Sequence, residues 1–222
     1  MSCDHYYGKV FAHVAGALGI AAVSAEHFDI SGLIKQYGGM EQSLSMKIVS
    51  AFLNLGVALI LLFGIFWTNP GSVFQYALFV AFAFWLGQSL HLVVSKLEKK
   101  HKLKQVLVLT VGIFLGMMAI GFYDNQNTLG FGAYFMAALA GLIIAQIFLI
   151  FFYSKEAQSI IAFFGASLFS LLVVYDTQVI KKNKQVCSVH LKRGIRPNFP
   201  KESLGLFLDF INLFTNLSQQ HN

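Results

Sequence analysis

Two aspartates inside otherwise apolar stretches are the residues of this sequence whose types and positions could do chemistry. Asp176 lies near the end of "LLVVYDTQVI", residues 171–180, and Asp209 lies within "LGLFLDFINLF", residues 204–214. A carboxylate inside a bilayer costs about 2.5–3.5 kcal/mol on insertion scales, so it is expected to face a partner or water. We therefore predict that the two carboxylates form one buried acidic pair.

Such a pair is predicted to compete for a single proton or cation. Two ionised carboxylates about 4 Å apart repel by roughly 4 kcal/mol at an effective dielectric near 20. They should therefore share one proton over some pH range and titrate as a unit. Ca²⁺ prefers oxygen ligands and could replace that proton, binding transiently to Asp176 and Asp209. The amide oxygens of Gln178, Asn212 and Asn216 are candidate supporting ligands, and no cofactor is expected.

Composition indicates the class of protein that must position this pair. The chain has 222 residues, of which 56% are hydrophobic and 12% charged, with a mean hydropathy of +0.65. Soluble domains contain about 25% charged residues. The sequence therefore predicts an all-α polytopic membrane protein, because helices satisfy their backbone polar groups within lipid. No nucleic-acid partner is expected.

Seven apolar segments organise the chain as a single membrane domain over residues 1–222. Most contain about the 20 residues needed to cross roughly 30 Å of hydrocarbon. The predicted spans are 10–25, 48–67, 73–94, 106–123, 131–153, 159–180 and 200–219. The last two run antiparallel, so Asp176, about 6 Å deep, and Asp209, about 9 Å deep, can lie at nearly one level.

The seventh segment carries a polar stripe of its own. Asp209, Asn212 and Asn216 follow an i, i+3, i+7 pattern, which places them on one helical face. Gly205 continues this stripe one turn earlier and would let another backbone approach closely. Pro200 is a favourable residue for the start of the helix. A polar face within the membrane is expected to face the bundle interior or water.

The sequence gives weaker signals for the orientation of the chain in the membrane and for cysteine chemistry. Lys and Arg divide equally between the two sides of a seven-span chain, so the positive-inside rule does not decide. The dense basic segment 181–201, predicted to be a loop, favours a cytoplasmic location for that side and for the N-terminus. Cys3 and Cys187 have neither metal nor redox spacing, so no disulfide framework is expected.

The segments "VVYDTQVIKK" and "FPKESLGLFLDFINLFTNL" resemble the transmembrane Bax inhibitor motif family, which includes Bax inhibitor-1-like and lifeguard proteins. The span count, the length and "LGFGAYFMAALAGLIIA" agree more loosely. The resemblance implies seven helices with six surrounding the last, and a pH-sensitive calcium leak whose pore aspartates are Asp176 and Asp209. It also implies a role in calcium homeostasis and cell death. The implied location is the bacterial inner membrane, or a eukaryotic endomembrane for a eukaryotic or viral source.

One departure from the family pattern concerns the cation that holds the aspartate pair closed. Bacterial channel-like members carry an arginine at the end of the second span that holds the pair closed. Here that end reads "GIFWTNPGS", with Thr68 and Asn69 and no cation. Lys181 and Lys182, about one turn beyond Asp176, are the nearest candidates in sequence for a substitute cation.

Three other functions compete with a non-enzymatic calcium leak. A non-conducting scaffold or anti-apoptotic interaction protein would use membrane-protein partners rather than Ca²⁺ and protons. An intramembrane aspartyl protease would also place "YD" in one span, but "LGLFL" before Asp209 lacks the Gly-x-Gly-Asp arrangement of those enzymes. A proton-coupled exchanger is the third. All four share the lipid bilayer as a partner.

Overall fold

The computed structural model describes residues 3–28, 44–124 and 128–220, with the backbone alone for 44–51. Its regular structure is helical, and no strand occurs in these described ranges, which confirms the predicted all-helical fold. The helices are α1 (Tyr6–His27), α3 (Leu44–Trp67), α4 (Val73–Ser89), α5 (His91–Lys99), α6 (Leu103–Tyr123), the short 3₁₀ helix η1 (Thr128–Phe131), α7 (Gly132–Phe151), α8 (Lys155–Lys192) and α9 (Phe199–Gln220).

Four of these elements are long and apolar enough to cross a membrane. They are α1, α6, α8 and the continuous helix formed by η1 and α7. The helices α4 and α5 add a fifth when taken together, because they form one apolar segment bent by 41°. The apolar stretch Phe52–Trp67 of α3 is shorter. The structure thus contains four to five candidate spans, and the number seven stays a prediction.

The predicted span 73–94 contains a helix break at Leu90, and its extent stays a prediction. The helix α4 ends at Ser89 and α5 begins at His91. The Ser89 hydroxyl donates to the Trp85 carbonyl (3.0 Å), a back-bond of the kind that bends helices. Hydropathy averaged over the whole segment does not reveal this break, although the polar residues Gln88, Ser89 and His91 lie beside it.

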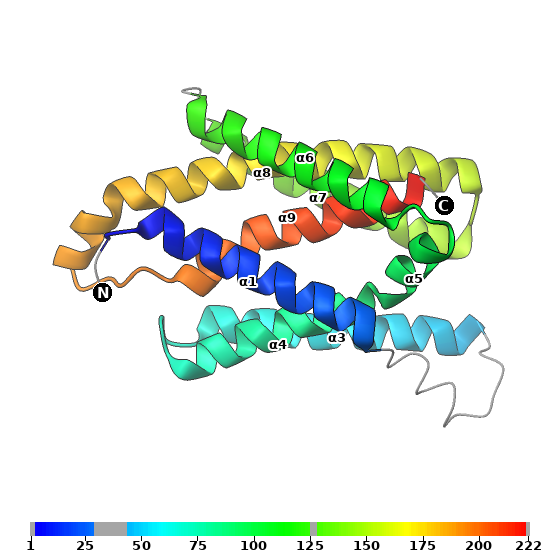
Figure 1. Cartoon of the computed structure of the whole chain (residues 1–222), viewed down its shortest axis with the longest axis horizontal. Helices are drawn as coiled ribbons and strands as arrows, with labels where there is room; N and C mark the ends of the chain where they lie inside the picture. Colours follow the sequence, from blue (N-terminus) through cyan, green and yellow to red (C-terminus); the bar gives the residue numbers. More distant parts are fainter. Residues whose placement is uncertain (1–2, 29–43, 125–127, 221–222) are drawn as a thin grey trace. The chain divides into compact units, whose positions relative to one another are not determined.

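The chain folds into two compact units, which we describe separately. The first holds the described residues 8–28, 44–95 and 196–203. Here α3 and α4 lie side by side, joined by a tight turn in which Gly71 adopts a φ of 75° (Figure 1). The buried Gln75 amide fixes this turn, because it accepts from the Gly71 N–H (3.0 Å) and donates to the Ile65 carbonyl (2.9 Å).

Within the same unit, α1 packs directly on α4 at a glycine. A Cβ placed on Gly87 would lie 2.2 Å from the Ala21 carbonyl oxygen and 2.5 Å from its Cα. The missing side chain therefore lets the two backbones touch. Beside this contact, the buried Ser24 hydroxyl donates to the Phe84 carbonyl (2.8 Å).

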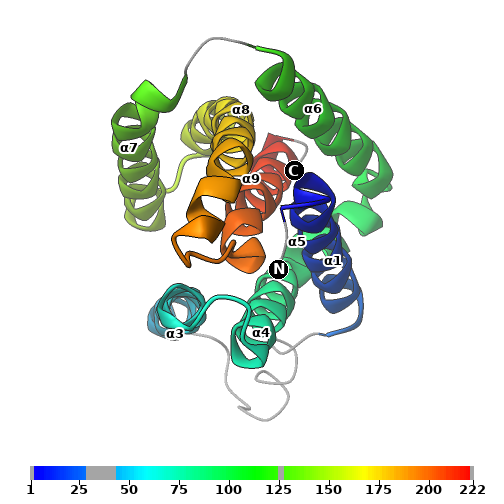
Figure 2. The ribbon, with the colours of Figure 1, turned by 90° about the vertical axis from the view of Figure 1, so that its left-hand side faces the viewer.

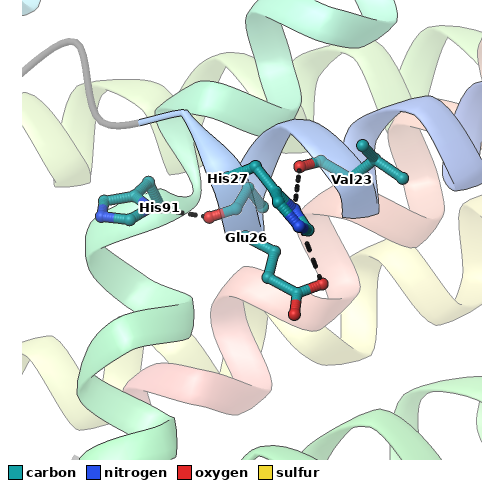
Figure 3. A network of polar contacts seen from close by, with 5 residues as sticks. Val23, Glu26, His27 and His91 are labelled. Carbon is teal, nitrogen blue, oxygen red and sulfur yellow. Dashed lines mark hydrogen bonds and ion pairs between the residues drawn. The ribbon is translucent and has the colours of Figure 1, made fainter.

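The end of α1 is tied to the start of α5 by histidine. The His91 Nδ1–H donates to the Ala25 carbonyl (2.7 Å). Figure 3 shows His91 beside the end of α1 that carries Glu26 and His27. His27 bonds to the Val23 carbonyl one turn earlier (3.3 Å) and lies 3.9 Å from the Glu26 carboxylate. These contacts satisfy α1 carbonyls at a helix end, where intrahelical donors run out.

The second unit holds the described residues 3–7, 96–124, 128–195 and 204–220. Its central element is α8, which packs against α6 on one side and α7 on the other (Figure 2). The α7 side chains are apolar except for Gln146 and the Tyr134 hydroxyl, and none of them is buried in the part of the chain that the structure describes. A helix of this kind is suited to face lipid.

The helix α8 continues for twelve residues beyond Ile180, where the sequence analysis ends its span. Residues 181–192 are therefore helical, and the prediction of a loop over 181–201 is wrong for them. The segment contains neither Pro nor Gly, so nothing in it stops a helix. The helix ends at a Schellman motif, in which Gly194 has a φ of 78° and the Ile195 N–H donates to the His190 carbonyl (2.9 Å).

A disulfide joins Cys3 to Cys187, contrary to the expectation from their spacing. Their Cα atoms lie 6.1 Å apart although 184 residues separate them in sequence. The pairing depends on the helical extension of α8, which carries Cys187 back to the N-terminal segment. A helix ending at residue 180 would leave Cys187 in a loop, with nothing in the sequence to place it beside Cys3.

Candidate functional site

The helix α9 begins with a well-formed N-terminal cap. The Asn198 side-chain oxygen accepts from the Lys201 N–H (3.1 Å), and Pro200 follows within the first turn. Asp209 and Asn216 fall on the buried face of α9, and Asn212 is half-buried.

Two glycines set the antiparallel register of α8 and α9. A Cβ on Gly205 of α9 would lie 2.0 Å from Oδ2 of Asp176, and a Cβ on Gly165 of α8 would lie 2.2 Å from Oδ1 of Asn216. Both spacings, 165 to 176 and 205 to 216, are eleven residues, which is about three helical turns. Each helix thus presents one glycine and one polar side chain to the other.

The structure brings the two predicted aspartates together. Their carboxyl groups lie within hydrogen-bonding reach of each other. Asp209 is 4% exposed, and Asp176 is half-buried. Neither group can donate while ionised, so this contact becomes a hydrogen bond only when one of them holds a proton. Within the described residues, Oδ2 of Asp209 has no hydrogen-bond partner.

Gln178 lies close to Asp176 in sequence but is engaged elsewhere. Its amide oxygen accepts from both the N–H (3.0 Å) and the hydroxyl (2.7 Å) of Thr128 in η1. The buried Gln178 side chain therefore anchors η1 to α8. Its predicted role as a supporting ligand of the pair stays a prediction.

The two asparagines of the stripe bond back to their own helix. The Asn212 amide donates to the Leu208 carbonyl (2.8 Å), and the Asn216 amide donates to the Asn212 carbonyl (2.7 Å). These bonds fix the orientation of each amide. In the described part of the chain, Oδ1 of buried Asn216 accepts from no donor and rests against Gly165.

Of the two lysines predicted as substitute cations, one is hydrogen-bonded to α6 and the other is exposed. The Lys181 ammonium donates to the Phe122 carbonyl (2.9 Å), near the C-terminal end of α6, where the helix dipole favours a cation. The Lys182 side chain is exposed. Neither lysine forms an ion pair with Asp176 or Asp209 within the described ranges.

The pair can offer a metal ion only part of a coordination shell. In the described residues, no group of three or more His, Cys, Asp or Glu side chains is placed to hold a metal. A Ca²⁺ ion takes six to eight oxygen ligands. Two carboxylates would therefore need help from amide oxygens, backbone carbonyls or water, an arrangement suited to transient binding.

Gly165 is the site residue that the sequence analysis missed. It contributes no functional group, and it lies in the apolar run "AFFGASLF". A signal was nevertheless present, because Gly165 precedes Asp176 by eleven residues and therefore lies on the same face of α8. Gly205 was identified, but its contact is the Asp176 carboxylate rather than a second backbone.

These helices define a multi-pass, all-helical integral membrane protein. A family model described as "Inhibitor of apoptosis-promoting Bax1" matches residues 3–220, and the chain belongs to this Bax inhibitor family.

An uncharacterized Caulobacter vibrioides protein is 29% identical over 202 residues, covering 90% of this chain and 79% of that protein. Mouse protein lifeguard 4 is 29% identical over 141 residues, covering 63% and 55%. The Escherichia coli inner membrane protein YbhL is 30% identical over 110 residues, covering 50% and 47%. The matches therefore span about half the length of these last two relatives.

Proposed function

We propose that this protein is a non-enzymatic, calcium-permeable leak pathway regulated by protons, with Asp176 and Asp209 as its pH-sensing pair. The observation that carries the proposal is the contact between two carboxyl groups on adjacent helices, one of them almost fully buried. Such a contact is not expected to stabilise the fold, because burying a charge costs free energy unless the charge is paired. A regulatory role explains why the chain keeps this pair despite the cost in free energy.

The proton determines whether the contact holds. With one shared proton, the two carboxyl groups can hydrogen-bond and keep α8 against α9 at this level. Loss of that proton leaves two anions, whose repulsion is about 4 kcal/mol at 4 Å and an effective dielectric near 20. We therefore expect flux to rise with pH as the pair opens. Ca²⁺ can occupy the opened pair because it neutralises both carboxylates.

The proposal extends to the architecture and the location. We propose seven spans, with α3 and α9 crossing in addition to the candidate spans, and six helices surrounding α9. Ca²⁺ is the permeant ion, and no cofactor takes part. A bacterial inner membrane or a eukaryotic endomembrane supplies the calcium gradient; the E. coli relative is named as an inner membrane protein.

The test is calcium flux from proteoliposomes against pH for the wild type, Asp176→Asn and Asp209→Asn. Asparagine keeps the shape of aspartate but cannot take up or release the proton. We expect both variants to lose the pH dependence of flux, whereas Lys99→Gln, at an exposed position of α5, leaves it unchanged. Equal effects from all three substitutions would count against the proposal.

The competing functions predict different outcomes of the same experiment. A scaffold would release no Ca²⁺ at any pH, and Asp176→Asn would change nothing. A proton-coupled exchanger would take up solute only under a pH gradient. An intramembrane protease would cleave a model single-span substrate and lose that cleavage in Asp209→Asn.

A further inference from the structure

We propose that the Cys3–Cys187 disulfide is a redox-controlled latch that regulates the aspartate pair through α8. The N-terminal latch consists of residues 3–7, held on the extension of α8 (residues 181–192) by this bond. Its regulatory part rests on the proposed function, since flux is the quantity regulated. The latch itself does not depend on the proposed function, because it concerns only a covalent bond between Cys3 and Cys187.

The latch lies where soluble redox partners can reach it. The 38 residues of α8 make a helix of about 57 Å, almost twice the roughly 30 Å of hydrocarbon. Cys187 lies seven residues, or about 10 Å, beyond Ile180, in a stretch that contains three lysines. Cys187 itself is buried, whereas Cys3 is half-buried. A reductant therefore gains access through the Cys3 sulfur.

The disulfide is accompanied by noncovalent contacts that involve the same N-terminal segment. The Tyr7 ring packs edge-on against Phe122 of α6, with the centroids 5.4 Å apart. The Lys184 ammonium of the α8 extension lies 5.7 Å from the Tyr7 ring centroid. Residues 3–7 accordingly belong to the same compact unit as α6 and α8. The latch thus joins the first turn of α1, the end of α6 and the extension of α8.

The position of Cys187 on α8 connects the latch to the pair. Gly165, Asp176 and Cys187 follow one another at intervals of eleven residues, so they share one face of a continuous helix. Toward the start of α8 this face contacts α9 through Gly165 and Asp176, and toward its end it is bonded to Cys3. The bonded state and the contact between the carboxyl groups occur together in this structure. We therefore assign the oxidised latch to the paired, low-flux state.

The chemistry is ordinary thiol–disulfide exchange. On oxidation, the Cys3 and Cys187 thiols give up two protons and two electrons to a small disulfide or to a thiol–disulfide oxidoreductase, whose own S–S bond breaks to give two thiols. On reduction, a dithiol attacks the Cys3 sulfur, forms a mixed disulfide and closes its own disulfide as it leaves. Release of Cys3 frees residues 3–7 from the covalent tie to α8.

The experiment compares the full-length protein in proteoliposomes after treatment with oxidised or with reduced dithiothreitol. Thiol alkylation followed by intact mass measures the bond, and hydrogen exchange of residues 3–9 and 181–192 measures the latch. Allosteric coupling is typically worth fivefold or more, so we expect reduction to raise calcium flux at fixed pH by about fivefold. Cys3→Ser and Cys187→Ser should show the high flux under both treatments. Each keeps one thiol, which controls for effects of the reagents on a free thiol.

The outcomes separate the latch from the proposed function. Absence of the bond after oxidation, or hydrogen exchange that does not respond to reduction, overturns the latch whatever the flux does. A bond that forms while wild-type flux stays equal in both states, with Asp209→Asn still altering that flux, overturns the regulation and leaves the function standing. Flux that ignores both aspartates overturns the function and, with it, the regulation, whereas a redox-dependent change in hydrogen exchange would still support the latch.

Discussion

The α1–α4 contact and the α8–α9 contact both depend on a glycine, but they differ in what lies against it. At Gly87 the nearest atoms belong to the Ala21 backbone. At Gly205 they belong to the Asp176 carboxylate, on a flexible side chain. The first glycine brings two backbones together, and the second makes room for a charge-bearing group.

This difference separates a structural contact from a candidate functional one. Beside Gly87, the polar side chain of Ser24 donates to a carbonyl, so its hydrogen-bonding capacity is used. Beside Gly205, acceptor-only carboxylates meet, and Oδ2 of Asp209 lacks a partner among the described residues. A contact that is complete adds stability, whereas one that still needs a proton or cation can respond to its surroundings.

The largest loss of stability is expected for Gly87→Ala. Its Cβ would lie 2.2–2.7 Å from three backbone atoms, so α1 must move away from α4. Overpacking of this kind costs about 1–3 kcal/mol, and each kcal/mol lowers Tm by about 2–4 °C. Thermal unfolding in detergent measures it. Gly16→Ala on α1, where a Cβ meets nothing within 4 Å, is the control. Equal Tm values for the two variants would remove the distinction between the contacts.

A smaller loss of stability with a larger change in flux is expected for Gly205→Ala. The side chain of Asp176 can rotate away from the new methyl group, so α8 and α9 need not separate. That rotation moves the carboxyl group away from Asp209. Calcium flux against pH should therefore differ from wild type, whereas Gly112→Ala, at an open position of α6, should not change it. An unaltered pH profile in Gly205→Ala would mean that the Asp176 position does not matter.

The smallest effect is expected for Lys181→Gln. The substitution removes a charge from the end of α6, which is worth about 0.3–1 kcal/mol, while glutamine can still donate to the Phe122 carbonyl. We expect a slight fall in Tm and an unchanged pH profile of flux, with exposed Lys182→Gln as the control. If Lys181→Gln changed the pH profile of flux as much as Asp176→Asn does, Lys181 would instead be identified as the cation that interacts with the aspartate pair.

The sequence predicted the helices and the meeting of the two aspartates for a physical reason. Charged groups within apolar segments need partners, and antiparallel neighbours place Asp176 and Asp209 near one level. The stripe through Gly205 and Asn216 followed from helical periodicity. These features could be predicted from the sequence because each depends on residues within one or two adjacent helices.

Other features depend on contacts between distant parts of the chain, and sequence analysis missed them. The Lys181 interaction requires the end of α6, which is far away in sequence. The disulfide requires both the N-terminal segment and the extension of α8. The extension itself was missed because hydropathy falls at residue 181, and a helix leaving a membrane has no reason to end where the lipid does.

The most direct test of the central claim is calcium flux from proteoliposomes between about pH 5 and pH 8, measured for the wild type and for Asp209→Asn. Wild-type flux should rise with pH, because loss of the shared proton separates the carboxyl groups. The variant should give a flat profile, because its amide can donate to Asp176 whether or not that carboxyl is ionised, so that no second anion repels it. A wild-type profile that is flat, or a variant profile that follows the wild type, would contradict the account.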